Sequence, residues 1–302
     1  VNSAGLVHVL DYALNAVKIF GTDGKLLNTI NGNFYGRNPV HGRNNQRHYL
    51  YTPMKILVDK YDNYWVLNKG RYEPGEILKF NSNNQFVCSY SYNTYYRPDI
   101  VDGIATDSQG RIFIKQNRSP HILVVGNDCS YVGMIEVPGT SGSSTIAINS
   151  SDQIFLASYR SKGLKKITNW DKFSNFQNSG KPYSEWIVKD SNYINGEYGN
   201  GSSKCNSGSG SIGLIDLTFT ADGTMYGLDY YCNKMVKISG STDSFSKGTG
   251  FGKIDASFGS KGSGNNQWDY GYGMGTDINA SGNNLYVADY QNQRIVKYDA
   301  ST

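Results

Sequence analysis

The segment Leu285–Asp299, LYVADYQNQRIVKYD, is the clearest copy of the pattern from which the fold can be predicted. Apolar residues 285–288 predict a short β-strand that ends at Asp289. The polar residues 290–293 predict a turn, and residues 294–298 predict a second strand. One small hairpin cannot cover both of its faces, so further copies of the pattern are expected elsewhere in the chain.

The pattern recurs about six times along the chain. The residue that closes the first strand of each copy is Asn2, Asp59, Asp107, Asn149, Thr220 or Asn279. A turn rich in Asn, Asp, Ser and Gly follows, and the second strand then ends nine residues after the closing residue in five copies and ten in the sixth. A third strand comes next, and KLLNTI, QFVCSY and YVGMIEV supply a fourth in some copies. Four short antiparallel strands per roughly 40–50 residues are typical of a propeller blade.

The sequence therefore predicts an all-β protein, a six-bladed β-propeller of four-stranded antiparallel blades. One domain spans residues 1–302, with repeat units at approximately 1–50, 51–96, 97–140, 141–210, 211–269 and 270–302. The first and last blades are expected to be incomplete, each short of a strand. An open strand edge beside the termini would then pair with another chain or a flanking segment, since exposed edges accept strands. The alternative is a trimmed chain, or two blades with three strands.

The units resemble NHL repeats, and the strongest matches are LYVADYQNQRIVKYD, MYGLDYYCNKMVKIS and VHVLDYALNAVKIFGTDGKLLNTI. Asn15, Asn233 and Asn292 lie between the second and third strands, as in that family. The pattern departs in the third and fourth units, where Gln116 and Ser158 replace the Asp that closes the second strand. The resemblance implies a six-bladed propeller and implies little about function.

Composition excludes some partners. The net charge is +4 and Lys and Arg form no dense runs, so nucleic acid is not an expected partner. No run of 18 apolar residues exists, so no membrane span is expected. An even number of cysteines, four, accompanies four glycosylation sequons, at Asn117, Asn149, Asn200 and Asn279. We therefore expect an extracellular, disulfide-bonded glycoprotein; the alternative is a cytosolic protein with buried thiols.

The four cysteines, Cys88, Cys129, Cys205 and Cys232, allow three disulfide pairings. Cys205 and Cys232 are expected on one face of the same unit, so a bridge between them would anchor the long 168–210 insertion. Cys88 and Cys129 fall at fourth-strand positions of adjacent units, and their pairing follows only by elimination. Such a bridge requires the outer strands of two blades to approach closely.

Tyrosines and basic residues gather in loops that should share one face of the propeller. The residue after the second strand is Tyr in four units: Tyr12, Tyr159, Tyr230 and Tyr290. Nearby loops hold Arg71, Arg118 and Arg160, and the 31–50 segment adds Arg43 and Arg47. Aromatic rings beside guanidinium groups suit recognition of a glycan or a protein. The alternative is that the tyrosines pack on neighbouring loops and the basic groups are solvated.

Two further sets of polar residues are candidates for chemical roles. Asp11, Asp229 and Asp289 recur at one position, and short acceptors there suit a structural hydrogen bond to the backbone of the following turn better than acid–base chemistry. His41, His48 and His121 are expected in loops of the Tyr-rich face and could hold zinc.

The favoured interpretation is an extracellular, non-catalytic binding or assembly module with no cofactor. The alternative is a metal-dependent lyase or hydrolase that uses zinc or calcium at the hub of the same face, since some NHL propellers are enzymes.

Overall fold

A computed structural model describes residues 1–38, 43–68, 75–92, 101–116, 120–137, 145–158, 163–167, 184–188, 213–230, 232–238, 254–270 and 277–301. These residues form strands and turns, and none of them lies in a helix. The chain divides into two compact units: Val1–Ile114 with Ile122–Met134, and Lys115–His121 with Ile135–Thr302. No helix long and apolar enough to cross a membrane occurs in this part of the chain.

The first unit contains two sheets, the first antiparallel and the second mixed, because β4 and β9 pair in parallel. The first sheet has three strands, β1 (Val7–Asp11), β2 (Ala16–Phe20) and β3 (Leu26–Ile30). The second has six, in the order β5-β4-β9-β8-β7-β6. Its strands are β4 (Asn33–Asn38), β5 (Arg43–Tyr49), β6 (Pro53–Val58), β7 (Tyr64–Asn68), β8 (Gly75–Phe80) and β9 (Phe86–Tyr92).

A third sheet, through which the boundary between the units passes, contains β10 (Val101–Thr106), β11 (Ile112–Gln116), β12 (His121–Val125) and β13 (Tyr131–Glu136). The second unit continues with β14 (Thr145–Ile148), β15 (Ile154–Ser158), β16 (Gly163–Ile167) and β17 (Ser184–Val188). Its next sheet contains β18 (Leu214–Phe219), β19 (Met225–Asp229), β20 (Lys234–Ile238) and β21 (Ile254–Phe258). A short parallel pair, β22 (Ser260–Lys261) and β23 (Gln267–Trp268), precedes the three-stranded sheet of β24 (Ile278–Ser281), β25 (Asn284–Asp289) and β26 (Arg294–Asp299).

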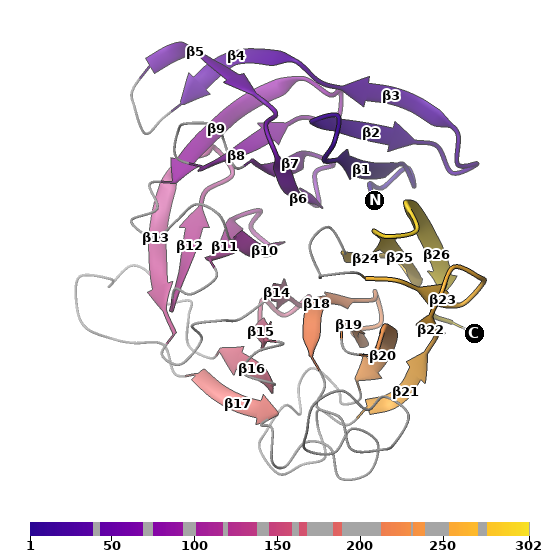
Figure 1. Cartoon of the computed structure of the whole chain (residues 1–302). Coiled ribbons are helices and arrows are strands. Elements are labelled where there is room, and N and C mark those ends of the chain that lie inside the picture. The colour runs from indigo at the N-terminus through magenta and orange to yellow at the C-terminus, as the bar shows by residue number, and fades with distance from the viewer. Residues whose placement is uncertain are drawn as a thin grey trace. The chain divides into compact units, whose positions relative to one another are not determined.

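The main sheets are blades, numbered one to six in chain order (Figure 1). Strand order follows chain order in five of them, whereas in the second blade β4 and β5 lie beyond β9. Three of them have the predicted four strands, and the first and last have three. Neighbouring first strands lie beside one another: β14 contacts β18, and β18 contacts β24. Within each unit, apolar side chains fill the space between adjacent blades, as in the cluster that joins Trp65 and Leu67 to Ile112 and Ile114.

The turns between first and second strands follow one geometry. The N–H of the closing residue donates to the carbonyl four residues later, as from Asp59 to Asn63 at 2.8 Å. The third residue after the closing residue is left-handed, with φ of 61° at Asp62, and Asn, Asp and Gly tolerate that conformation best. The same backbone bond begins at the predicted positions Asn2, Asp107, Asn149 and Thr220.

The prediction that Asn279 closes the first strand of the sixth unit is wrong. Asn279 lies within β24, opposite Tyr286, and the turn begins two residues later at Ser281, which pairs with Asn284. This hairpin has a two-residue loop with Gly282 in the left-handed region at φ 59°. The shorter loop explains why the number of residues from Asn279 to the end of the second strand differs from the number in the other units.

The segment 31–50 forms a β-hairpin, not the loop that its composition suggested. β4 pairs with β5, and β4 also pairs in parallel with the fourth strand of the second blade at Arg37 and Cys88. Figure 1 shows β4 and β5 lying along the outer side of β9. The hairpin thus widens this blade to six strands and covers its outer edge.

A disulfide joins the second and third blades. Cys88 in β9 and Cys129 in the turn before β13 are bonded, with Cα atoms 6.1 Å apart, so these outer elements do approach closely enough. Lys79 reaches the same turn: its buried Nζ donates to the backbone carbonyl of Asn127 at 2.7 Å and lies 5.0 Å from the Trp65 ring. Burial lowers the pKa of Lys79. The 126–130 turn is thus held on the second blade at two points.

Replacing both Cys88 and Cys129 by Ala is expected to lower the free energy of unfolding by about 2–4 kcal/mol, because the bridge closes a loop of 41 residues in the unfolded chain. Urea unfolding of the double variant measures this loss. Hydrogen exchange should also quicken in the 126–130 turn. An unchanged midpoint would mean that Lys79 and the apolar contacts hold the two blades together without the bridge.

Candidate functional site

The second strands end in a polar side chain that binds the backbone of the loop leading into the same blade. Three such hydrogen bonds join Asn68 Oδ1 to the N–H of Tyr51 at 2.6 Å, Asp229 Oδ1 to that of Gly213 at 3.2 Å, and Asp289 Oδ1 to that of Asp269 at 2.9 Å. A short acceptor side chain at this position therefore fixes the loop before the first strand. The structural interpretation of Asp229 and Asp289 agrees with these contacts.

Asp11 occupies the same position in the first blade and binds its own turn. Its Oδ1 accepts a hydrogen bond from the N–H of Leu14 at 2.9 Å, and its Oδ2 lies 2.7 Å from Lys18 Nζ. The hydrogen bond from Lys18 lowers the pKa of the Asp11 carboxyl. Asp11 is thus an ionised anchor for the turn that carries Tyr12.

The asparagines between the second and third strands bind the loop of the next blade. Asn15 Oδ1 accepts from the N–H of Thr52 at 2.6 Å, and Asn233 Oδ1 accepts from that of Tyr270 at 3.0 Å. Both asparagines are left-handed, with φ of 50° and 49°, which Asn tolerates better than most residues. Two successive N–H groups of one loop, those of Tyr51 and Thr52, are therefore held by two neighbouring blades.

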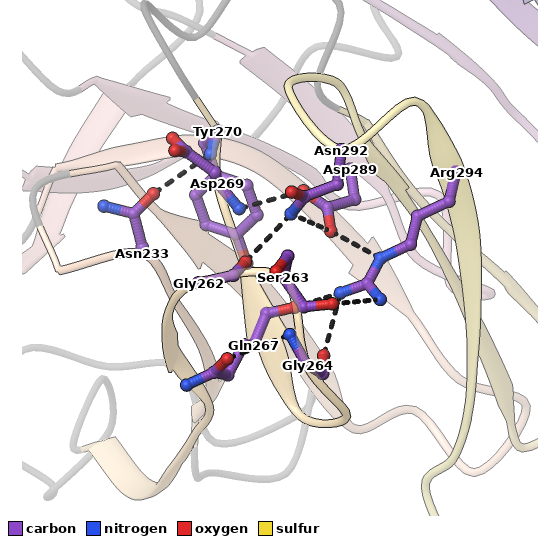
Figure 2. A network of polar contacts seen from close by, with 10 residues as sticks. All are labelled: Asn233, Gly262, Ser263, Gly264, Gln267, Asp269, Tyr270, Asp289, Asn292 and Arg294. Atoms are coloured by element: carbon purple, nitrogen blue, oxygen red, sulfur yellow. Dashed lines mark hydrogen bonds and ion pairs between the residues drawn. The ribbon is translucent and has the colours of Figure 1, made fainter.

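Figure 2 shows the fullest version of this arrangement, around the loop 262–270. Asp289 Oδ2 accepts from Asn292 Nδ2 at 2.8 Å and from Arg294 Nε at 2.9 Å. Asn292 also donates to the carbonyl of Gly262 at 2.9 Å. The other guanidinium nitrogens of Arg294 donate to three backbone carbonyls, those of Ser263, Gly264 and Gln267, at 2.8, 2.9 and 2.6 Å.

Sequence reasoning gave no role to Arg294, whose only signal is its position five residues after an Asp that is predicted to be structural. Its guanidinium neutralises the fully buried Asp289 and gathers the loop against the last blade. The polar groups of this network bind the backbone of the loop 262–270. The role of the network is therefore to hold that loop in place.

The tyrosines after the second strands differ in exposure. Tyr12 and Tyr290 have exposed fractions of 59% and 48%. The backbone of each begins a closed turn, since their carbonyls accept from Asn15 and Gln293. Tyr230 is instead partly buried against the apolar cluster of the fifth and sixth blades. Tyr159 lies outside the described residues. The structure thus presents two of the four predicted rings to solvent on fixed turns.

Of the five basic residues predicted for the same face, two lie in a strand and three lie outside the described residues. Arg43 and Arg47 belong to β5 of the additional hairpin, and the predicted loop position is wrong for both. Arg71, Arg118 and Arg160 lie outside the described residues.

His48 does not lie in a loop. It is in β5, and its buried ring contacts Phe86 at a centroid distance of 5.0 Å. Its Nδ1 lies 3.2 Å from both carboxylate oxygens of Glu76. His121 begins β12, and His41 lies outside the described residues. Among the described residues, no group of three or more His, Cys, Asp or Glu side chains is placed to share a metal ion.

The remaining predicted modification sites fall in different settings. Asn149 closes β14 and is 4% exposed, and its Nδ2 donates to Gln153 at 2.9 Å, so a glycan there would break the turn. Asn279 lies on β24, whereas Asn117 and Asn200 are outside the described residues. Cys232 is disulfide-bonded, and its predicted partner Cys205 is outside the described residues.

No protein-family model matches the chain, and a search of curated proteins finds no match. Solved structures do match. Virginiamycin B lyase from Staphylococcus aureus aligns with a TM-score of 0.55 at 14% identity, over 99% of this chain and 82% of that one. A chain of the nidogen/laminin complex gives 0.55 at 11% identity, over 98% and 89%. Hydrazine synthase from Kuenenia stuttgartiensis gives 0.59 at 9% identity, over 98% and 92%.

These neighbours are β-propeller proteins, so the class of this chain follows from its blades and from the comparisons together: it has a β-propeller fold. At such low identity the likeness concerns the fold alone.

Proposed function

We propose that this β-propeller is a non-catalytic binding module that recognises a protein or a glycan through the loops after its second strands. The observation that carries the proposal is the exposure of Tyr12 and Tyr290 on turns whose backbone is fixed by hydrogen bonds. Tyrosine offers a large amphipathic contact area, and a ring that is already held in place loses little conformational entropy on binding. The residues Arg71, Arg118, Arg160 and Tyr159 complete the proposed face, together with Tyr230.

The structural neighbours include both a lyase and a chain of a protein complex, so the fold is compatible with either class. We favour binding over a metal-dependent lyase or hydrolase because the histidine set proposed for zinc includes His48. That side chain is buried and directed at Glu76.

We further propose an NHL-type propeller in an extracellular setting, with glycans at Asn117, Asn200 or Asn279. The Cys88–Cys129 disulfide supports an oxidising compartment. The three-stranded sheets β1–β3 and β24–β26 support the additional proposal that strand edges of two copies pair.

Replacing Tyr12 and Tyr290 together by Ala tests the proposed face. We expect at least a tenfold weaker signal on a glycan array or a protein array, since a central aromatic contact contributes about 1–2 kcal/mol or more to binding. Tyr61→Ala is the matched control, because Tyr61 is 53% exposed but lies in a turn between first and second strands. Equal loss in both variants, or a wild-type chain that binds neither array, would contradict the proposal.

A further inference from the structure

One position in every second strand is aromatic or imidazole. It lies three residues before the strand's last residue, and its occupants are His8, Trp65, Phe113, Phe155, Tyr226 and Tyr286. Trp65, Phe113 and Phe155 have no exposed surface, and Tyr226 is 2% exposed. His8 is the one member of this series that can take up a proton near neutral pH.

In the second and fifth blades, the position faces the next blade along the chain. Trp65 packs with Ile112 and Ile114 of the third blade. Tyr226 packs with Leu285 and Val287 of the last blade. The aromatic residue therefore contributes to the apolar contact between two successive blades, and an apolar ring suits that place.

His8 makes the equivalent contact between the first and second blades. Its ring lies against Tyr64 of β7, with 5.0 Å between the ring centroids. Its cross-strand neighbour is the buried Ile19. The surrounding cluster contains Leu10, Val66 and further apolar side chains of both blades.

Two polar atoms at this contact are buried without a hydrogen-bond partner among the described residues: His8 Nδ1 and the Tyr64 hydroxyl. An unpaired imidazole nitrogen can stay neutral at moderate cost, whereas a protonated ring would place a charge and an additional donor in the same apolar setting. The geometry thus favours the neutral ring for as long as the two blades stay in contact.

The charges nearby do not reverse this preference. Burial is the main cause that lowers the pKa of His8, to about 4, and the amino group of Val1 lowers it further. The Leu6 backbone and the charge of Asp62 raise the pKa, but by less than burial lowers it. On β2, Lys18 is paired with Asp11 at 2.7 Å. On β6, which also lies beside β1, the ionisable side chain is Lys55.

We propose that His8 makes the contact between the first and second blades acid-labile, so that its protonation separates β1–β3 from the second blade while the other blades stay folded. The separated state is local because the other members of the series are Trp, Phe and Tyr, which do not change charge between pH 4 and 7. Separation would expose Tyr64 and Phe80, whose rings stack at 4.9 Å.

The sign of the effect follows from the two protonation states. The separated state binds a proton near pH 6.5 and the closed state only near pH 4, so closure is favoured most above pH 6.5 and weakens as the pH falls toward 4. Between pH 7 and pH 4.5 the opening equilibrium should shift by about 60-fold at most, and by at least about tenfold after allowance for the exposed part of the ring.

Hydrogen exchange with mass spectrometry, corrected for the intrinsic pH dependence of exchange, tests the proposal on the whole chain. Peptides from β1 and β2 should lose at least about tenfold protection between pH 7 and pH 4.5. Peptides from β18–β20 should not. His8→Phe, which restores the aromatic residue of the other blades, should remove the pH dependence. His121→Phe is the control and should leave it intact.

Equal protection of β1 and β2 at both pH values in the wild-type chain would overturn the proposal, as would an unaltered loss in His8→Phe. A direct measurement covers the case in which His8→Phe does not fold. Titration of the wild-type histidine ring protons by NMR should find one imidazole with a pKa below 5, assigned to His8. A His8 that titrates near 6.5 would also overturn it.

Discussion

Asp289→Ala is expected to lower the free energy of unfolding by about 3–5 kcal/mol, as when one partner of a buried ion pair is removed. The Asp289 carboxylate is fully buried and accepts hydrogen bonds from the Asp269 backbone, Asn292 and Arg294. Loss of the carboxylate would remove the negative charge that neutralises Arg294 and leave its guanidinium beside backbone carbonyls. It would also release the loop 262–270 (Figure 2). Urea unfolding followed by circular dichroism measures the change.

Asp299→Ala on the neighbouring strand is the matched control. Asp299 is exposed, hydrogen-bonds Ser301, and should be replaceable without measurable loss of stability. Asp289→Asn keeps an acceptor for the Asp269 N–H but removes the charge that Arg294 neutralises, so an intermediate loss is expected. If Asp289→Ala behaved like Asp299→Ala, the network would have no role in holding the loop.

The sequence predicted the blades because their turns and strands are local. A closing Asp or Asn, a left-handed residue three positions later and an apolar strand can all be recognised within ten residues. The hairpin β4–β5 could not be recognised in this way. Its strands, NFYGRN and RNNQRHY, are polar, and β4 joins the second blade through β9, about 50 residues further along the chain. Parallel pairing with a distant strand leaves no local pattern.

The structural role of Asp11, Asp229 and Asp289, which end second strands, was predicted from one kind of contact. That contact was a hydrogen bond to the following turn, which Asp11 makes to Leu14. Asp229 and Asp289 instead bind loops that precede them by 16 and 20 residues. The residue type reveals a short acceptor, but its partner depends on how the blade folds back on its own loop.

His8 shows a signal that was present in the sequence and was not used. The second strands VHVLD, YWVLN, IFIKQ, IFLAS, MYGLD and LYVAD carry an aromatic or imidazole side chain at one offset from their last residue. Comparison of that column alone would have identified His8 as the exception. That it lies against Tyr64 in a contact between blades required the structure.

Display of the tyrosines and stability of the blades depend on the same turns. Asn15 accepts from Thr52 of the next blade and also donates its N–H to the carbonyl of Tyr12. A change at Asn15 would therefore alter both the contact between blades and the position of the Tyr12 ring. Variants of the rings themselves separate the two effects, because Tyr12 and Tyr290 are exposed and contribute little to the core.

Asp216→Ala should also cost about 3–5 kcal/mol of stability, because Asp216 connects the first strands of three blades in the second unit. It is 5% exposed and lies on β18. Its Oδ1 accepts from the Thr145 hydroxyl of β14 at 2.6 Å, and its Oδ2 accepts from the N–H of Ile278 of β24 at 3.0 Å. Removal of the carboxylate leaves both donors buried without this acceptor.

A double-mutant cycle with Thr145→Val distinguishes this role from general packing. Valine keeps the shape of Thr145 and removes only its hydroxyl, so the single variant should cost about 1–2 kcal/mol. If the two side chains act through their hydrogen bond, the losses of Asp216→Ala and Thr145→Val should fail to add by about 1 kcal/mol or more. Additive losses in urea unfolding would show that Asp216 stabilises the second unit through its backbone partners, among them Ile278, and not through the hydroxyl of β14.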